Sequence, residues 1–179
     1  MSEKYTPKVL DIIQDDILRR NIDSPLYCVC KEVSREEMES EEFRHFILDL
    51  VETMKYHKAL GIAANQVGVQ KRVMVIRREN NNPLVIMNPT IVAHSNEKIN
   101  LAEGCLSYPG LYANIKRPRI VTVKYNQYSN STILLESITT FAIGESRIIQ
   151  HEMDHLDGKV FLDHASRYHR DKALKNYGR

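Results

Sequence analysis

His151 and His155 are four residues apart in the segment His-Glu-Met-Asp-His. On a helix this spacing places both imidazoles on one face, where they can reach the same metal ion. Glu152 would lie about 100° around the helix from His151, so it can flank the metal without binding it. From there it can accept a proton from a water that the metal activates. The segment therefore predicts a metal-dependent hydrolase site.

A catalytic metal site usually has three protein ligands, and this segment supplies two. Glu152 is the last glutamate in the chain, so no downstream glutamate can be the third ligand. The longer motif HExxHxxGxxH is matched at Gly158 but not at its last position, which is Phe161. The downstream candidates that remain are Asp163, His164, His169 and Asp171.

Cys105 is the upstream candidate for the third ligand. It follows Gly104, which permits a close backbone approach beside the thiol, and a thiolate suits Zn²⁺ or Fe²⁺. Burial as a small apolar side chain explains this cysteine equally well from spacing alone. Cys28 and Cys30 also compete as ligands, but their alternation on one strand face favours simple burial.

The overall composition is that of an ordinary globular domain. Of the 179 residues, 42% are hydrophobic and 27% are charged, and the net charge of +2 argues against a whole-domain nucleic-acid binder. No apolar run approaches the length of about 18 residues that a membrane-spanning helix needs. The acidic N-terminal segment does not resemble a secretory signal. We therefore expect a cytoplasmic protein whose three cysteines stay reduced.

Apolar periodicity predicts three helices. The first is a short amphipathic helix over residues 8–19, and the last runs from about Gly144 to Leu156. The longest begins at a capping box formed by Ser34 and Glu37 and ends near Lys58. Its apolar stripe consists of Phe43, Phe46, Ile47, Leu50, Val51 and Met54.

Between these helices the chain is rich in Val, Ile and Thr, which favours strands. The expected strands are residues 26–30, 72–77, 84–87, 91–94, 119–125, 132–136 and 139–143. The fold class predicted is α+β, with mixed or antiparallel sheets packed around the helix that carries the two histidines, and one long N-terminal amphipathic helix. We expect a single domain over residues 1–179, with an extension of about residues 1–24 and a polar, basic tail of about residues 164–179.

Three segments together resemble the peptide deformylase family. They are Gly61–Gln66, Glu103–Ser107 and Gln150–His155, and their order and separations are similar to those of the family from about Pro25 to Ala165. The resemblance implies that Cys105, His151 and His155 hold one divalent metal. Fe²⁺ is implied as the physiological ion, whereas Zn²⁺, Ni²⁺ or Co²⁺ could occupy a purified sample.

The resemblance also implies roles in the removal of formyl groups from N-formylmethionyl nascent peptides. Glu152 would be the general base and acid. Gln66 and the backbone N–H of Leu106 would stabilise the oxyanion. The segment Leu60-Gly61-Ile62 would pair with an extended peptide, and Leu60 and Ile148 would line the methionine pocket. Glu103 and Gln150 would orient the ligands.

Two positions depart from the family pattern. Ala59 replaces the first glycine of Gly-x-Gly, and Gly144-Glu145-Ser146 replaces bulky apolar residues in the methionine pocket. Two other functions stay open: a different HExxH metallopeptidase, or a deformylase-like protein that binds peptides or ribosomes without turnover. A ribosome contact would use the basic tail, for which a solvated terminus is the favoured interpretation. No membrane partner or sequence-specific nucleic acid is expected.

Overall fold

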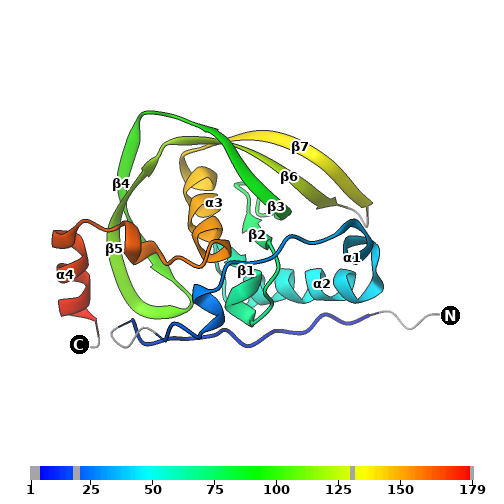
Figure 1. Ribbon diagram of the computed structural model, residues 1–179, viewed down its shortest axis with the longest axis horizontal. Coiled ribbons are helices and arrows are strands. Elements are labelled where there is room, and N and C mark those ends of the chain that lie inside the picture. The colour runs from blue at the N-terminus through cyan, green and yellow to red at the C-terminus, as the bar shows by residue number, and fades with distance from the viewer. Residues whose placement is uncertain (1–4, 18–20, 130–131, 178–179) are drawn as a thin grey trace.

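The computed structural model describes residues 5–17, 21–129 and 132–177, which form two antiparallel sheets and four α-helices in an α+β arrangement (Figure 1). The larger sheet has the strand order β1-β2-β3-β6-β7, and the smaller sheet pairs β4 with β5. The strands are β1 Gly61–Ala63, β2 Val73–Arg77, β3 Pro83–His94, β4 Lys98–Cys105, β5 Tyr108–Pro118, β6 Ile120–Ser129 and β7 Thr132–Ala142.

The helices lie before, between and after these strands. The α-helices are α1 Arg35–Glu39, α2 Glu41–Tyr56, α3 Ile143–Leu156 and α4 Arg167–Asn176. Three short 3₁₀ helices are η2 Pro25–Tyr27, η3 Ala64–Val67 and η4 Phe161–His164. Of the helices in the described residues, none has the length and apolar character needed to cross a membrane.

The larger sheet is covered on both faces, and β2 shows this best. Its residues alternate between two buried clusters: Val73 and Val75 pack with apolar residues of α2, whereas Met74 and Ile76 pack with those of α3. Successive side chains of a strand point to opposite faces, so a continuous apolar run is the expected pattern for a strand covered on both sides. β2 therefore packs against α2 on one face of the sheet and against α3 on the other.

Helix α3 lies between the two sheets (Figure 1), with contacts to β1, β2 and β7 on one side and to β5 on the other. On the side of the smaller sheet, β5 contributes Leu111, Ala113 and Ile115 to a third buried cluster that also contains residues of η4 and α4. This packing explains why every residue of α3 from Ile149 to Leu156 is buried, including the polar ones.

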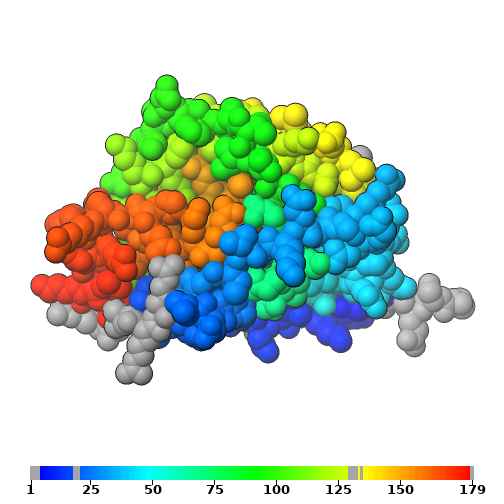
Figure 2. Space-filling model, viewed as in Figure 1, coloured from blue at the N-terminus to red at the C-terminus, as the bar shows by residue number. Residues whose placement is uncertain are grey.

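The N-terminal segment differs from the prediction. Within residues 8–17 of the expected helix the structure contains no α-helix, and residues 18 and 19 lie outside the described residues. The segment instead runs along one edge of the molecule, in blue in Figures 1 and 2. Its backbone donors bind other parts of the chain: the N–H of Leu10 donates to Thr53 Oγ1 at 2.9 Å, and that of Ile13 to the carbonyl oxygen of Gln66 at 2.8 Å. Tertiary hydrogen bonds replace those of a helix.

The two neighbouring cysteines do not share a buried strand face, so that prediction is wrong. The 3₁₀ helix η2 occupies Pro25–Tyr27, and the backbone that follows makes only isolated bridges. Cys30 is buried, whereas Cys28 is exposed. Ser24 caps the turn through its hydroxyl, which accepts the N–H of Leu26, and a capped turn competes with an extended strand at this point.

Several boundaries also differ. The long helix predicted from Ser34 is interrupted at Ser40, whose extended backbone separates α1 from α2 and whose hydroxyl caps α2. The capping box of Ser34 and Glu37 is confirmed. The expected strands 84–87 and 91–94 form one strand, β3, and those at 132–136 and 139–143 form β7, because the positive φ of Asn88 and of Glu136 is accommodated by shifts of register.

Candidate active site

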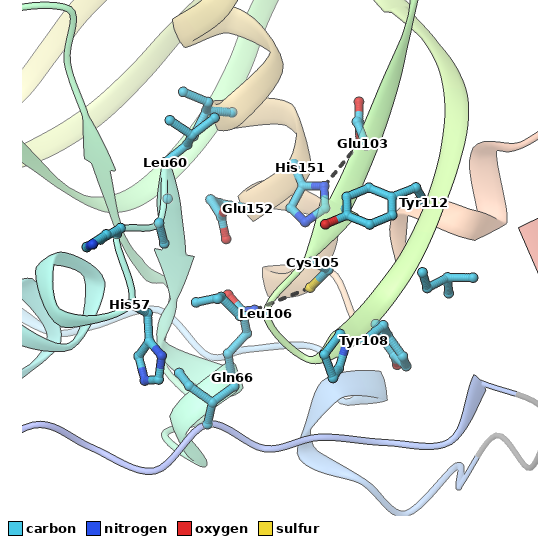
Figure 3. A pocket seen from close by; sticks show the side chains of 18 of the residues that line it. His57, Leu60, Gln66, Glu103, Cys105, Leu106, Tyr108, Tyr112, His151 and Glu152 are labelled. Atoms are coloured by element: carbon cyan, nitrogen blue, oxygen red, sulfur yellow. Dashed lines mark hydrogen bonds and ion pairs between the residues drawn. The ribbon is translucent and has the colours of Figure 1, made fainter. Parts of the chain in front are cut away.

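A cleft of about 700 Å³ opens between β1, the β4–β5 turn and α3 (Figure 3). The edge of β1 and the segment before it form one wall, the smaller sheet forms the other, and α3 forms the floor. The described residues that line it include His57, Leu60, Gly61, Gln66, Cys105, Leu106, Tyr112, Ile148, His151 and Glu152.

The floor presents His151 and Glu152 of α3, and His155 lies buried one helical turn further along. The rings of His151 and His155 are 5.2 Å apart between centroids, as the spacing of one helical turn requires. Cys105 ends β4, and its Sγ lies 3.2 Å from Nε2 of His155. One ligand atom from each of Cys105, His151 and His155 lies within 4.8 Å of the others. A single divalent ion can reach atoms this close, and two imidazoles with a thiolate suit Zn²⁺ or Fe²⁺.

The electrostatics of this group favour the form of cysteine that binds metals. Burial opposes ionisation of the Cys105 thiol, but the imidazoles of His155 and His151 hold its pKa well below the usual range. Burial likewise opposes protonation of His151, but Cys105 and Glu103 raise its pKa well above the usual value. The cysteine is thus held as the thiolate, which is the form that binds metals, and His151 must release its proton when a metal binds.

Glu103 supports His151 from behind. Its Oε2 lies 3.1 Å from Nδ1 of His151, and its carboxylate also pairs with Arg117 and Arg147. Burial opposes ionisation of Glu103, yet the hydrogen bonds from His151 and Arg117 lower its pKa to about 2. Because the Glu103 carboxylate contacts Nδ1 of His151, the Nε2 atom faces Cys105. Carboxylates commonly orient metal-binding histidines in this way.

Gln150 makes different contacts from those expected of it. Its Nε2 donates to the carbonyl oxygen of Pro118 at 3.0 Å and to Oγ of Ser146 at 3.0 Å, so it fastens the first turns of α3 to the end of β5. The sequence did not single out Arg117, whose guanidinium joins Glu103 to Asp154. It lies on β5, a strand that sequence reasoning missed.

Three residues of the tail lie outside the metal-capable group. The group found within the described residues contains only Cys105, His151 and His155. His164 contacts a neighbour of the ligands instead, with Nε2 2.9 Å from Oδ1 of Asp154. His169 Nδ1 faces the hydroxyl of Ser166, which caps α4. Asp171 pairs with Arg167 along α4.

Glu152 projects into the cleft beside Gly61 (Figure 3). A Cβ atom on Gly61 would lie 2.6 Å from Oε1 of Glu152, so only glycine leaves room for the carboxylate there. Burial raises the pKa of Glu152 to about 7. Its Oε2 is buried and has no hydrogen-bond partner among the described residues. A carboxyl group with a pKa near neutrality can both take and return a proton.

Gln66 and Leu106 line the cleft beside Cys105 (Figure 3). The Oε1 of Gln66 accepts the N–H of Ala63 at 2.9 Å, and its Nε2 lies 3.5 Å from Sγ of Cys105. The amide nitrogen is therefore directed toward the metal-capable group. These are the residues expected to stabilise an oxyanion.

The expected peptide-binding residues divide into two kinds. Leu60, Gly61 and Ile148 line the cleft, and Leu60 is 54% exposed. Ile62 is fully buried in the cluster beneath α2, so its side chain faces away from the cleft. β1 pairs with β2 on one side only and is an edge strand of the larger sheet. Its other edge is free to pair with a peptide.

The two departures from the family pattern have local explanations. The positive φ in this segment, 52°, falls at Lys58 and not at Ala59, so the alanine adopts ordinary backbone angles. Gly144 lines the cleft with open space around it, whereas Glu145 turns away to pair with Arg78. The cleft is consequently wider at Gly144 than an apolar side chain would leave it.

Comparisons with known proteins agree with this geometry. The model of the family described as polypeptide deformylase matches residues 16–171. A peptide deformylase from Caulobacter vibrioides is 40% identical over 142 residues, which cover 77% of this chain and 80% of the relative.

Two solved structures have the same fold. A peptide deformylase from Ehrlichia chaffeensis in complex with actinonin has a TM-score of 0.78 and 36% identity, over 94% of this chain and 95% of the other. One from Synechococcus elongatus, also with actinonin, has a TM-score of 0.80 and 35% identity, over 99% of this chain and 91% of the other. With its Cys-His-His cluster and buried glutamate at the bottom of a cleft, the chain belongs to the polypeptide deformylase family.

Proposed function

We propose that this protein hydrolyses the N-formyl group of formylmethionyl peptides and releases formate. The observation that carries the proposal is the buried Glu152, with a pKa of about 7, next to the cluster of Cys105, His151 and His155 in a cleft bounded by a free strand edge. Family membership supports the same reaction.

Cys105, His151 and His155 would hold one divalent ion, with Fe²⁺ as the proposed physiological metal and Zn²⁺, Ni²⁺ or Co²⁺ as substitutes. When bound there, such an ion supplies Lewis acidity that lowers the pKa of water and polarises a carbonyl group. Glu103 orients His151 through Nδ1 and keeps Nε2 available.

Glu152 is proposed as the group that moves the proton. Its carboxylate accepts a proton from the attacking water and returns it to the amine that leaves, since its pKa lies near neutrality. Gln66 donates its amide N–H to the oxyanion that forms on the formyl group, together with the backbone N–H of Leu106. Both residues line the cleft beside Cys105.

The peptide is proposed to add to the free edge of β1. Main-chain hydrogen bonds to Gly61 and its neighbours would hold peptides of varied sequence in an extended form. Leu60 and Ile148 would contact the methionine side chain, and the open space at Gly144 would enlarge that pocket. Ile62 would contribute backbone groups only, because its side chain is buried.

The remaining proposals concern the whole chain. We treat residues 1–179 as one domain that acts in the cytoplasm on nascent chains. For α4 we favour a solvated helix over a ribosome-binding one, because Arg167, one of its four Lys and Arg side chains, pairs with Asp171 on the same helix and both side chains of the pair are exposed.

The test is formate release from a formyl-Met peptide by protein loaded anaerobically with Fe²⁺. We expect turnover by the wild type and a loss of about 10²-fold to 10⁴-fold in kcat for Glu152→Gln, with metal stoichiometry unchanged. Absence of formate from metal-loaded wild type would reject the proposal. Internal cleavage of unformylated peptides would instead identify a general metallopeptidase, and binding without turnover would identify a non-catalytic protein.

A further inference from the structure

The N-terminal strap, defined as residues 5–17, runs along the lower edge of the molecule in Figure 1. One end is fastened to α2: the hydroxyl of Tyr5 and the backbone N–H of Lys8 both donate to the carboxylate of Asp49, at 2.8 and 2.7 Å. The strap then passes the cleft, which Ile12 and Gln14 help to line. The family resemblance gave this segment no function.

The other end of the strap is fastened to two residues beside the metal-capable group. The N–H of Ile13 donates to the carbonyl oxygen of Gln66 at 2.8 Å, and that of Asp15 donates to the carbonyl oxygen of Ser107 at 3.2 Å. Gln66 belongs to η3, which follows β1 of the larger sheet, whereas Ser107 lies in the turn of the smaller sheet. The strap thus joins the two walls of the cleft.

The same two residues also contact each other through their side chains. The Nε2 of Gln66 donates to Oγ of Ser107 at 3.2 Å, while its Oε1 accepts the N–H of Ala63 at 2.9 Å. Because an N–H cannot donate to an N–H, the bond from Ala63 fixes which end of the amide is oxygen. The hydroxyl of Ser107 then takes one amide hydrogen and leaves the second directed toward Cys105.

Because Gln66 and Ser107 are buried, the orientation of the Gln66 amide depends on hydrogen bonds to other protein groups. Ser107 is 0% and Gln66 2% exposed, so bulk water cannot replace a lost hydrogen-bond partner without rearrangement. An amide that lost its contact to Ser107 would keep the bond from Ala63 and the longer contact to Sγ of Cys105, and its NH₂ group would be held less firmly. A donor aimed at a developing negative charge is effective only when it is already held in place.

We propose that Ser107 and the N-terminal strap are positioning elements for catalysis: they hold the Gln66 amide in the orientation that donates to the oxyanion. The inference rests on the proposed deformylase function and adds residues to it. Ser107 acts on the amide directly through its hydroxyl. The strap acts by tying the backbone of Gln66 to that of Ser107, which keeps their separation constant.

The first test is Ser107→Ala in the full-length, metal-loaded enzyme. We expect kcat for a formyl-Met peptide to fall about tenfold, with KM and metal content within about twofold of wild type, since the lost contact matters in the transition state. The variant Gln66→Ala should lose more. In the double variant, Ser107→Ala should cause no further loss of kcat, because its effect passes through Gln66.

The second test removes one backbone donor of the strap. Ile13→Pro deletes the N–H that binds Gln66, and Ile13→Ala keeps that N–H while it deletes the same apolar side chain. We expect Ile13→Pro to lower kcat several-fold more than Ile13→Ala does, and the difference to vanish in the Gln66→Ala background. Asp11→Pro is the matched control, because Asp11 is exposed and its N–H makes no bond to a described residue. It should lower kcat less than Ile13→Pro does.

The outcomes distinguish a failure of the proposed deformylase function from a failure of the proposed positioning role. Wild type that releases no formate contradicts the deformylase function itself. Active wild type with losses that multiply in the Gln66→Ala background would show that Ser107 and the strap act structurally, and would overturn the positioning role. If Ile13→Pro fails to fold, the Ser107→Ala cycle decides alone, and a kcat for Ser107→Ala within twofold of wild type overturns the inference.

Discussion

Nδ1 of His151 lies 3.1 Å from Oε2 of Glu103, and this contact connects a candidate metal ligand to a buried ion-pair network. Glu103 is one carboxylate shared by Arg117, Arg147 and the histidine. The orientation of the His151 imidazole therefore depends on Arg117 and Arg147, which have no proposed role in the reaction. Stability and metal affinity are coupled at this residue.

Glu103→Gln should expose that coupling. Removal of the buried negative charge leaves Arg147 without its carboxylate partner and Arg117 with that of Asp154 alone, for which we expect a loss of about 3–5 kcal/mol in the free energy of unfolding. Metal affinity should fall about 10-fold to 100-fold, because His151 loses its orienting carboxylate. Urea unfolding and competitive metal titration measure the two effects. Glu97→Gln is the control, since its ion pair with Arg119 is solvent-exposed and should contribute under about 1 kcal/mol.

Acid should remove the contribution that ionised Glu103 makes to the free energy of unfolding. Its pKa of about 2 in the folded protein lies below the ordinary value of 4.5, so the folded state favours the ionised form. The resulting stabilisation, about 3 kcal/mol, is present above about pH 5 and is lost as pH falls through 4 toward 2. We expect unfolding free energies measured from pH 7 to pH 3 to fall more steeply in wild type than in Glu103→Gln. Parallel curves would contradict this.

Gly61→Ala should damage the site by direct collision. The new Cβ would lie 2.6 Å from Oε1 of Glu152 and 2.7 Å from Cγ2 of Ile148, and both neighbours belong to the packed α3. We expect a loss of about 1–3 kcal/mol in unfolding free energy and a fall in kcat of more than about tenfold. For comparison, Gly144→Ala places its Cβ in open space on α3 and should leave stability equal or slightly higher.

Lys58→Gly should stabilise the protein. Lys58 adopts a φ of 52° just beyond the end of α2, a position where glycine is the usual residue because it has no Cβ. Relief of that strain should exceed the entropy cost of glycine and give about 0.5–1 kcal/mol. Asn81→Gly, at a φ of 63°, should gain less, because asparagine tolerates the left-handed region. Thermal unfolding of both variants checks the order.

The chemistry-bearing residues were easier to predict than the elements around them. Spacing alone pairs His151 with His155, since four residues make one helical turn, and the structure places them 5.2 Å apart between ring centroids. Cys105 was undecided from spacing, because its contact with His155 spans 50 residues and only the folded chain brings them together. Tertiary packing also directs His164 to Asp154, whereas His169 and Asp171 make local contacts on α4 outside the metal-capable group.

The two strands that the sequence did not predict, β4 and β5, show the limits of prediction from hydrophobic periodicity. β4 is mostly exposed, and its one buried residue is the charged Glu103, so no buried apolar face indicates a strand there. In β5, burial alternates over Leu111, Ala113 and Ile115 with the exposed Tyr112 between them, a period of two that would have predicted the strand. For the N-terminal segment the error was the reverse, because a helix was predicted where the described residues form no α-helix. Its apolar residues suggested one helical face, but Ile12 and Ile13 pack in separate clusters.

The ligand set has a consequence for the protein's own biosynthesis. The sulfur donor lies at residue 105, on β4, whereas the two nitrogen donors lie on α3 at residues 151 and 155. A growing chain that has not yet reached residue 151 contains only one of the three donors, together with the strap that will later hold Gln66. Metal binding by all three donors therefore requires synthesis past residue 155, and an enzyme that acts on unfinished chains is inert until its own chain has passed that point.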